Sequence, residues 1–290
     1  MESTIAHSNQ IRPLEGAKLL IAAFVLSLAN FVVVLDMTIA NVSIAHIAGG
    51  LSISVLEGTY VITSYAVAEA IIVPLTGWLA FRFGTVKTFT NCLILFGVCS
   101  FLCGIAQDLG MIVVARILQG LSGGPLMPLS QTLLMQIFPE NKKGTAIGLW
   151  AMTTLVAPVM GPIVGGYICD NYGWEYIFFI NVPLALTCGL LNKRLLKRFE
   201  SVLQRNKIDF VGLILLILWV ASLQIMLDTG KDHDWFESDF IKILFFIFVF
   251  GFICFVIYEP TQNKPIVDLR VFKHKGYTAL SLIHISEPTR

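Results

Sequence analysis

The sequence has 290 residues and a formal net charge of +1; 56% of the residues are hydrophobic and 13% are charged. Soluble domains contain about 45–50% apolar and about 25% charged residues, so this composition excludes an ordinary soluble protein. The apolar residues form stretches of about 20 residues, each long enough to cross a hydrocarbon core of about 30 Å as a helix. The sequence therefore predicts an all-α polytopic membrane protein, and the small net charge gives no sign of nucleic-acid binding.

Eight membrane spans are predicted from hydropathy, with glycine, proline and charged residues marking their ends. They cover residues 18–39, 58–80, 88–106, 110–137, 145–167, 175–192, 210–228 and 241–258. The first apolar run is too long for the core of a signal peptide, and no small-residue cleavage site follows it. We therefore expect it to remain in the protein as a span.

Lysine and arginine residues gather on alternate loops. Sixteen lie on one side of the predicted membrane, against only Lys231 on the other side, where acidic residues surround it. Because cytoplasmic loops carry an excess of lysine and arginine, this asymmetry predicts a cytoplasmic N-terminus and an even number of spans up to Tyr258.

The spans and loops divide the chain into segments. A cytoplasmic N-terminal segment (1–17) precedes a six-helix half (18–192), and a basic cytoplasmic linker (193–208) leads to a two-helix insert (209–258). Residues 259–279 are expected to form a cytoplasmic loop and the start of a ninth span. Residues 280–290 resemble the translation of a sequencing-library adapter, so we expect a non-native tail on a C-terminally truncated chain.

Patterns typical of soluble enzymes are missing from the sequence. The six cysteines are scattered, mostly in apolar stretches, with no histidine or carboxylate at ligand spacing, so we expect no metal site, no cofactor and no disulfide framework. The metalloprotease pattern HExxH does not occur. The sequence therefore predicts a protein that is not an enzyme.

Charged side chains at membrane depth indicate function, because each costs at least about 2.5–3.5 kcal/mol on insertion scales. Asp36 lies near the outer end of the first span and is either a proton-coupling residue or an interfacial cap. Glu69 lies near the middle of the second span and is either a proton-carrying or cation-sensing residue or a structural partner. From its depth, we expect Glu69 to be more deeply buried than Asp36.

The fourth span carries a third charge, Arg116, at the start of a stripe of polar or small residues. The near-helical spacing places the stripe on one face, which we expect to point into the helix bundle. The residues that follow Arg116 in the stripe are Gln119, Gly120, Gly123, Met127 and Gln131.

The first span has polar residues on two faces. Asp36 falls almost opposite the others at 100° per residue. Either Asp36 contacts a neighbouring helix or the span is locally distorted. The residues that share the other face are Ser27, Asn30, Thr38 and Asn41.

The fifth span combines small residues with proline. Ala157, Gly161 and Gly165 repeat at four-residue spacing, which lets a neighbouring helix approach closely. Pro158 and Pro162 each remove an intrahelical hydrogen bond and are expected to bend the helix. The pattern favours either close helix packing or a pliable helix at a moving interface of a transporter.

Eight motifs in this order resemble the major facilitator superfamily, and within it the fourteen-span drug:proton antiporters of the EmrB/QacA type, most of all its EmrB branch. The resemblance as a whole covers nearly all of residues 1–279. The motifs are LDMTIANVSI (35–44), PLTGWLAFRFG (74–84), RILQG (116–120), GPLMPLSQ (124–131), APVMGPIVGGY (157–167), WEYIFFINVP (174–183), LQIMLDTG (223–230) and PIVDLRVF (265–272).

This resemblance implies an N-terminal six-helix half of a major facilitator fold, made of two inverted three-helix repeats, plus two additional transmembrane helices. It identifies an antiporter motif at Pro158, Gly161, Pro162, Gly165 and Gly166, and a cytoplasmic loop motif at Gly77, Arg82, Gly84 and Lys87. The loop motif departs from the family pattern, because Phe81 occupies the position of the usual acidic residue.

The implied function is export of hydrophobic or cationic toxic compounds across the bacterial inner membrane, driven by proton entry. The resemblance also implies a periplasmic adaptor of the EmrA type and an outer-membrane channel as partners, besides membrane lipid. Asp36, Glu69 and Arg116 are the candidate proton-coupling residues, and the candidate cavity-lining residues are Asn41, Gln119, Gln131 and Trp150.

Two other functions remain open. One is a major facilitator transporter for a specific metabolite or siderophore. The other is a non-transporting structural or assembly subunit, although such a subunit has no need of Glu69 in mid-membrane.

Overall fold

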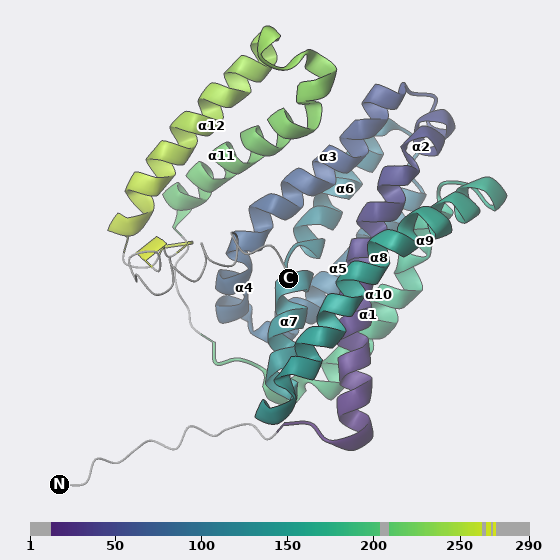
Figure 1. Cartoon of the computed structure of the whole chain (residues 1–290), viewed down its shortest axis with the longest axis vertical. Helices are drawn as coiled ribbons and strands as arrows, with labels where there is room; N and C mark the ends of the chain where they lie inside the picture. Colours follow the sequence, from purple (N-terminus) through teal and green to yellow (C-terminus); the bar gives the residue numbers. More distant parts are fainter. Residues whose placement is uncertain (1–12, 204–208, 263–264, 268, 271–290) are drawn as a thin grey trace, which may run out of the picture. The chain divides into compact units, whose positions relative to one another are not determined.

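A computed structural model describes residues 13–203, 209–262, 265–267 and 269–270 (Figure 1). All regular elements in these residues are helical. Eight helices or helix runs are long and apolar enough to cross a membrane, which confirms the predicted number of spans. The chain divides into two compact units, Met1–Gln204 and Arg205–Arg290.

Six spans form the first unit, and their order matches the predicted one. A short helix that was not predicted, α2 (Ile44–Gly50), follows the first span. The spans are α1 (Gly16–Val42), α3 (Val55–Ile72) continued by α4 (Thr76–Phe83), α5 (Thr85–Gly104), α6 (Leu109–Gly123) continued by α7 (Leu126–Ile137), α8 (Lys143–Asn171), and α9 (Tyr176–Phe179) continued by α10 (Asn181–Leu195).

Proline accounts for two of the interruptions. The α3–α4 junction is a 3-10 turn, Val73–Leu75, that contains Pro74, and the α6–α7 junction contains Pro125. Proline lacks the N–H that an α-helix needs, so the regular hydrogen-bond pattern stops there. By contrast, α8 continues through both of its prolines as one 29-residue helix.

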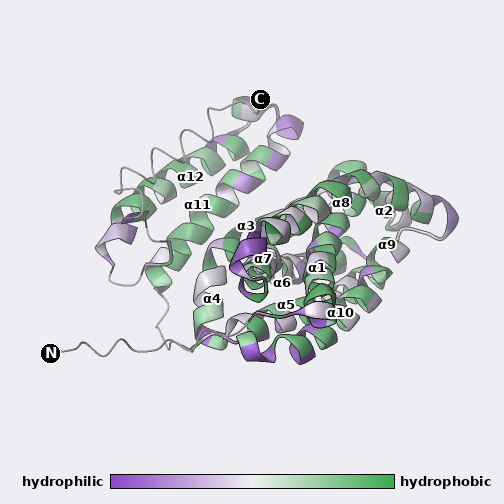
Figure 2. Cartoon of the chain, turned by 60° about the horizontal axis from the view of Figure 1, so that its bottom comes forward, coloured by the Kyte–Doolittle hydropathy of each residue, from purple (hydrophilic) through white to green (hydrophobic). Residues whose placement is uncertain are grey.

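The first span is the centre of the six-helix unit. α1 packs against α8 along one side and against α7 and α10 along others. Its buried apolar residues join both main core clusters. In Figure 2, hydrophobic residues run along the spanning helices and hydrophilic ones gather near helix ends, as expected for a bundle in lipid.

The second unit is a helical hairpin of α11 (Phe210–Thr229) and α12 (Asp239–Tyr258). Trp219 packs against the rings of Phe248, Phe252 and Phe255, with the nearest centroid 5.3 Å away. These aromatic contacts hold the two helices together.

The charge count needs one correction. Lys242 lies in the first turn of α12 and pairs with Asp239 at 2.8 Å, so it belongs to the same end of the hairpin as Lys231. The asymmetry is therefore 16 to 2. Some of the predictions lie outside the described residues: the segment 1–12, the linker residues 204–208, the start of a ninth span and the tail 280–290.

Two glycines offer a matched test of helix packing. A Cβ atom at position 120 would lie 2.5 Å from the backbone oxygen of Tyr65, whereas one at position 148 meets nothing within 4 Å. We expect Gly120→Ala to destabilise the purified protein by about 1–3 kcal/mol through overpacking. Gly148→Ala is expected to stabilise it by about 0.5–1 kcal/mol, because alanine has less conformational freedom than glycine in the unfolded chain and therefore loses less on folding. Thermal unfolding in detergent measures both, and equal shifts for the two variants would contradict the packing.

Candidate functional site

The centre of the six-helix unit contains an ion pair between α1 and α6. Nη1 of Arg116 lies 2.6 Å from Oδ2 of Asp36. The side chains are 0% and 1% exposed, so neither charge reaches the surface of the unit. A buried charge without a partner is strongly unfavourable, and this pair therefore fixes the two helices against each other.

Two further side chains, Gln119 and Asn181, form hydrogen bonds with the carboxylate or the guanidinium. Oδ1 of Asp36 accepts hydrogen bonds from Nδ2 of Asn181 at 2.6 Å and from Nε2 of Gln119 at 3.1 Å. Nη1 of Arg116 also donates to Oε1 of Gln119 at 2.8 Å. Asn181 lies on α10 and reaches Oγ of Ser100 on α5 at 3.2 Å. The network thus connects four spans.

α3 closes the site from another direction. Nε of Arg116 donates to the backbone oxygen of Val61 at 3.1 Å, and the guanidinium lies 4.3 Å from the centroid of the Tyr65 ring. The Phe178 ring is 5.5 Å away on another side. Cation–π contact with aromatic faces stabilises a desolvated guanidinium.

Some polar atoms of the network have no hydrogen-bond partner within the described part of the chain. They are Nη2 of Arg116, the hydroxyl of Tyr65 and Oδ1 of Asn181. Unsatisfied buried polar atoms are rare in proteins and are often found at sites with a function.

The structure resolves the two possibilities for Asp36. α1 runs without interruption from Gly16 to Val42, and Asp36 contacts neighbouring helices. The opposite face binds α8, where Nδ2 of Asn30 donates to the hydroxyl oxygens of Thr153 at 3.0 Å and Thr154 at 2.9 Å. The two polar faces of α1 therefore serve two different groups of helices.

The expected order of burial was wrong. Asp36 is buried, whereas Glu69 is partly exposed and forms no ion pair with any described residue. Depth along a span does not determine burial, because only a small part of the span formed by α3 and α4 is buried. Of the two acids, only Asp36 is part of the central network.

The fourth-span stripe is largely buried, but its last residue is not. Gly120 and Gly123 face α3, where added Cβ atoms would approach the backbone and hydroxyl oxygens of Tyr65. Gln131 lies on α7 beyond the break and is exposed. The break at Pro125 is the physical reason, because it interrupts the helix that carries the stripe.

The four candidate cavity-lining residues do not form one group. Gln119 is buried in the ion-pair network, and Trp150 is partly buried, its indole N–H donating to Oγ of Ser130 at 3.2 Å. Asn41, near the end of α1, and Gln131 are exposed. No hydrogen bond between described residues links these four side chains to one another.

The antiporter motif on α8 is divided between two faces. Gly161 and Gly165 are buried against α1, where added Cβ atoms would collide with Thr38 and lie 3.1 Å from Val42. These contacts agree with the close-packing interpretation. The other motif residues are uncovered or partly covered: Pro158, Pro162 and Gly166.

The cytoplasmic loop motif lies at the junction of α4 and α5. Gly84 has a φ of +97°, which an L side chain rarely adopts, and it directly precedes α5. Gly77 is exposed, while Arg82 and Lys87 flank the turn.

Glu200 supplies a carboxylate to the start of α5, close to the loop motif in which Phe81 replaces the usual acid. Its carboxylate accepts hydrogen bonds from the backbone N–H groups of Val86 at 3.0 Å and Lys87 at 3.1 Å, so it caps the start of α5. Sequence reasoning missed this residue, since it lies far away in the chain.

Asn181 was also missed as a site residue. The available signal was an amide in an otherwise apolar run, inside the motif WEYIFFINVP. Ser100 and Tyr65 gave weaker signals, because both residue types are common in spans. In the described residues, no group of three or more His, Cys, Asp or Glu side chains could hold a metal ion.

Comparison with known proteins gives a consistent result. Residues 26–285 match the Major Facilitator Superfamily profile. The chain is 50% identical over 270 residues to "Multidrug export protein EmrB" of Escherichia coli (strain K12), covering 93% of this chain and 53% of that protein. It is 47% identical over 266 residues to "Fatty acid resistance protein FarB" of Neisseria gonorrhoeae, covering 92% and 52%. The chain therefore spans about half the length of the curated relatives it matches.

Solved structures support the fold alone. A crystal structure of the peptide transporter POT in complex with sulfate aligns with a TM-score of 0.63 at 15% identity, over 96% of this chain and 64% of that chain.

The ion pair predicts non-additive stability effects. Arg116→Met alone leaves a buried carboxylate without its counter-ion, so we expect it to destabilise the purified protein by about 3–5 kcal/mol. Adding Asp36→Asn to that variant is expected to recover part of the loss. Denaturant unfolding of both single variants and the double variant measures the coupling; strictly additive effects would show that the pair is energetically unimportant.

Proposed function

Because the chain belongs to the major facilitator superfamily, we propose that the protein carrying it is a proton-coupled antiporter that exports hydrophobic or cationic toxic compounds. The observation that supports this most directly is the buried Asp36–Arg116 pair, which three spans hold by hydrogen bonds in addition to the salt bridge. Ionisable groups inside a membrane bundle are expensive and typically lie on proton or substrate paths.

Proton binding is proposed to act on the pair as follows. A proton on Asp36 removes the negative charge that faces Arg116 and weakens the contact between α1 and α6. Asn181 on α10 shares the same carboxylate, so the change reaches a third helix. A group whose charge alters the packing of several helices couples proton occupancy to conformation.

Glu69 is the second proposed coupling acid. It lies on α3, partly exposed, and its backbone approaches α6 near Gly124. A site that accepts a cationic compound needs a carboxylate that the protein does not already neutralise, and Glu69 forms no ion pair with a described residue. Arg116 remains the proposed partner that tunes the site.

The proposed substrate class rests on the names of the relatives. One is named for multidrug export and another for fatty acid resistance, and fatty acids are hydrophobic. Asn41, Gln119, Gln131 and Trp150 are the proposed lining residues. The alternative is uptake or export of one defined metabolite or siderophore. A narrow substrate range in a transport assay would favour this alternative.

The cellular arrangement is also proposed. The charge asymmetry of the loops supports a cytoplasmic N-terminus in a bacterial inner membrane. The resemblance to the EmrB branch supports a periplasmic adaptor of the EmrA type and an outer-membrane channel as partners. Purification after crosslinking in cells tests for such an adaptor.

A transport assay tests the proton-coupling role of Asp36. In the natural protein that carries this sequence, reconstituted into proteoliposomes, we expect Asp36→Asn to lower proton-driven export of a cationic dye at least about tenfold, within the usual range of coupling energies. Glu69→Gln is expected to reduce export of cationic dyes more than that of neutral ones, because it removes the unpaired carboxylate.

Asp170→Asn is the matched control, because Asp170 is an exposed carboxylate whose only described ion pair is with His46 at 3.5 Å. It is expected to leave export unchanged. Full export by Asp36→Asn with an unaltered pH profile would reject Asp36 as the coupling residue. Loss of pH dependence in Glu69→Gln alone would transfer the role to Glu69.

A further inference from the structure

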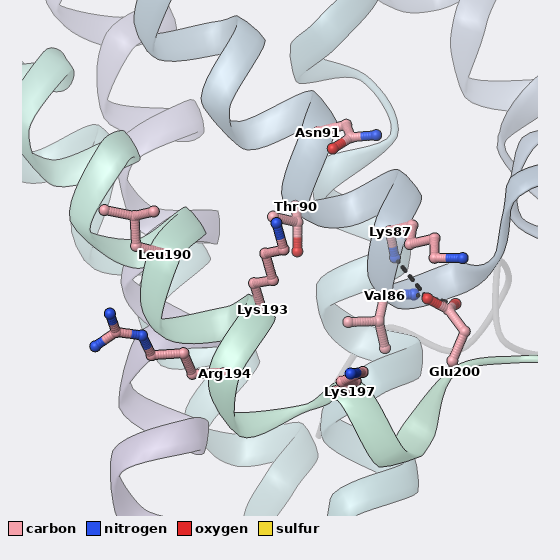
Figure 3. A pocket seen from close by; sticks show the side chains of 9 residues that line it. All are labelled: Val86, Lys87, Thr90, Asn91, Leu190, Lys193, Arg194, Lys197 and Glu200. Atoms are coloured by element: carbon pink, nitrogen blue, oxygen red, sulfur yellow. Dashed lines mark hydrogen bonds between the residues drawn. The ribbon is translucent and has the colours of Figure 1, made fainter.

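A pocket of about 510 Å³ lies at the end of the six-helix unit where α5 begins and α10 ends (Figure 3). It is open at the surface and is formed by two helix ends and the segment that follows α10. None of the residues that line it belongs to the central ion-pair network. The lining residues are Val86, Lys87, Thr90, Asn91, Leu190, Lys193, Arg194, Lys197 and Glu200.

The pocket is strongly basic. Lys87, Lys193, Arg194 and Lys197 all line it, and none of them forms an ion pair with a described residue. Figure 3 shows Lys193 reaching from α10 toward Thr90 on α5, with Arg194 on the other flank of α10. Four cationic side chains at one concave surface favour a ligand with negative charge.

The carboxylate of Glu200, the acid that lines this pocket, already binds backbone N–H groups of α5. Its two carboxylate oxygens accept hydrogen bonds from the backbone N–H groups of Val86 and Lys87. It therefore neutralises the start of α5 and leaves the four cationic side chains without a protein carboxylate that binds them. The pocket therefore keeps an excess of positive charge that no protein carboxylate in the described part of the chain pairs with.

The pocket continues into an apolar strip on the same two helices. Leu190 and Leu186 on α10 are 58% and 36% exposed, and Leu95 on α5 is 49% exposed. α5 and α10 approach closely at Gly189, where a Cβ atom would lie 2.9 Å from Ile94. An anionic group bound in the pocket therefore has an uncovered apolar surface leading from it toward the middle of the spans.

We propose that this pocket binds the headgroup of an anionic phospholipid, whose acyl chains lie along the exposed leucines of α5 and α10. Basic pockets between spanning helices on the cytoplasmic side suit such headgroups, and this end carries the excess of lysine and arginine. A free phosphate satisfies the charge but makes no use of the apolar strip. The inference does not depend on the proposed transport function.

Lipid retention tests the proposal. The purified protein is placed in nanodiscs of phosphatidylcholine with added phosphatidylglycerol, and bound lipid is counted by native mass spectrometry after release. We expect preferential retention of phosphatidylglycerol. Lys193→Gln with Lys197→Gln is expected to weaken it about 30-fold, since each cation near the headgroup contributes about a fivefold factor. Lys193→Arg with Lys197→Arg is expected to retain binding, because the charge is kept.

The matched control is Lys18→Gln with Lys142→Gln. Both lysines are exposed, lie at the same end of the unit and do not line the pocket. Equal loss in the control variant would attribute the binding to general surface charge and overturn the proposal. Unchanged lipid retention in Lys193→Gln with Lys197→Gln, at an unchanged melting temperature, would also overturn the proposal. Complete displacement of the lipid by millimolar inorganic phosphate would do the same.

Discussion

The cost of placing a charge inside a bundle that crosses lipid is the constraint on which the rest of this structure depends. Arg116 cannot be deprotonated, so its charge must be met where it stands. α1 supplies the carboxylate of Asp36, α3 a backbone oxygen and an aromatic face, and α10 the amide that holds the carboxylate. α1 therefore packs where Asp36 reaches both Arg116 on α6 and Asn181 on α10.

This constraint also explains which parts of the fold could be predicted from the sequence. Every spanning segment must satisfy its own backbone, so helices of about 20 apolar residues follow directly from hydropathy. Arg116 and Asp36 were found for the same reason, since charge stands out in an apolar run. The ion pair between them could not be predicted, because helical periodicity shows on which face of its own helix a side chain lies but not which neighbouring helix it contacts. Glu69 shows the limit, because a position near the middle of a span did not predict how far its side chain is buried.

Residues found only in the structure act through contacts that are distant in the sequence. Asn181 is 145 positions from Asp36, and Glu200 is 114 positions from Val86. In the second case the loop motif lacks its usual acid at Phe81, yet the start of α5 still receives a carboxylate. A negative group is favourable at that helix end, and here a residue distant in the chain supplies it.

Under the proposed mechanism, the two faces of α1 respond differently when Asp36 binds a proton. Toward α8, the contact depends on Asn30 donating to two threonines and on the absence of side chains at Gly161 and Gly165, none of which titrates. Toward α6 and α10, the contact depends on the carboxylate of Asp36. Neutralising that group loosens only one side of the helix, so α1 and α8 are expected to stay together while α6 and α10 rearrange relative to them. One face of α1 then stays fixed and the other can change its contacts. A membrane bundle with two stable states needs both, because a small local change leads to a large movement only at an interface that can pack in two ways.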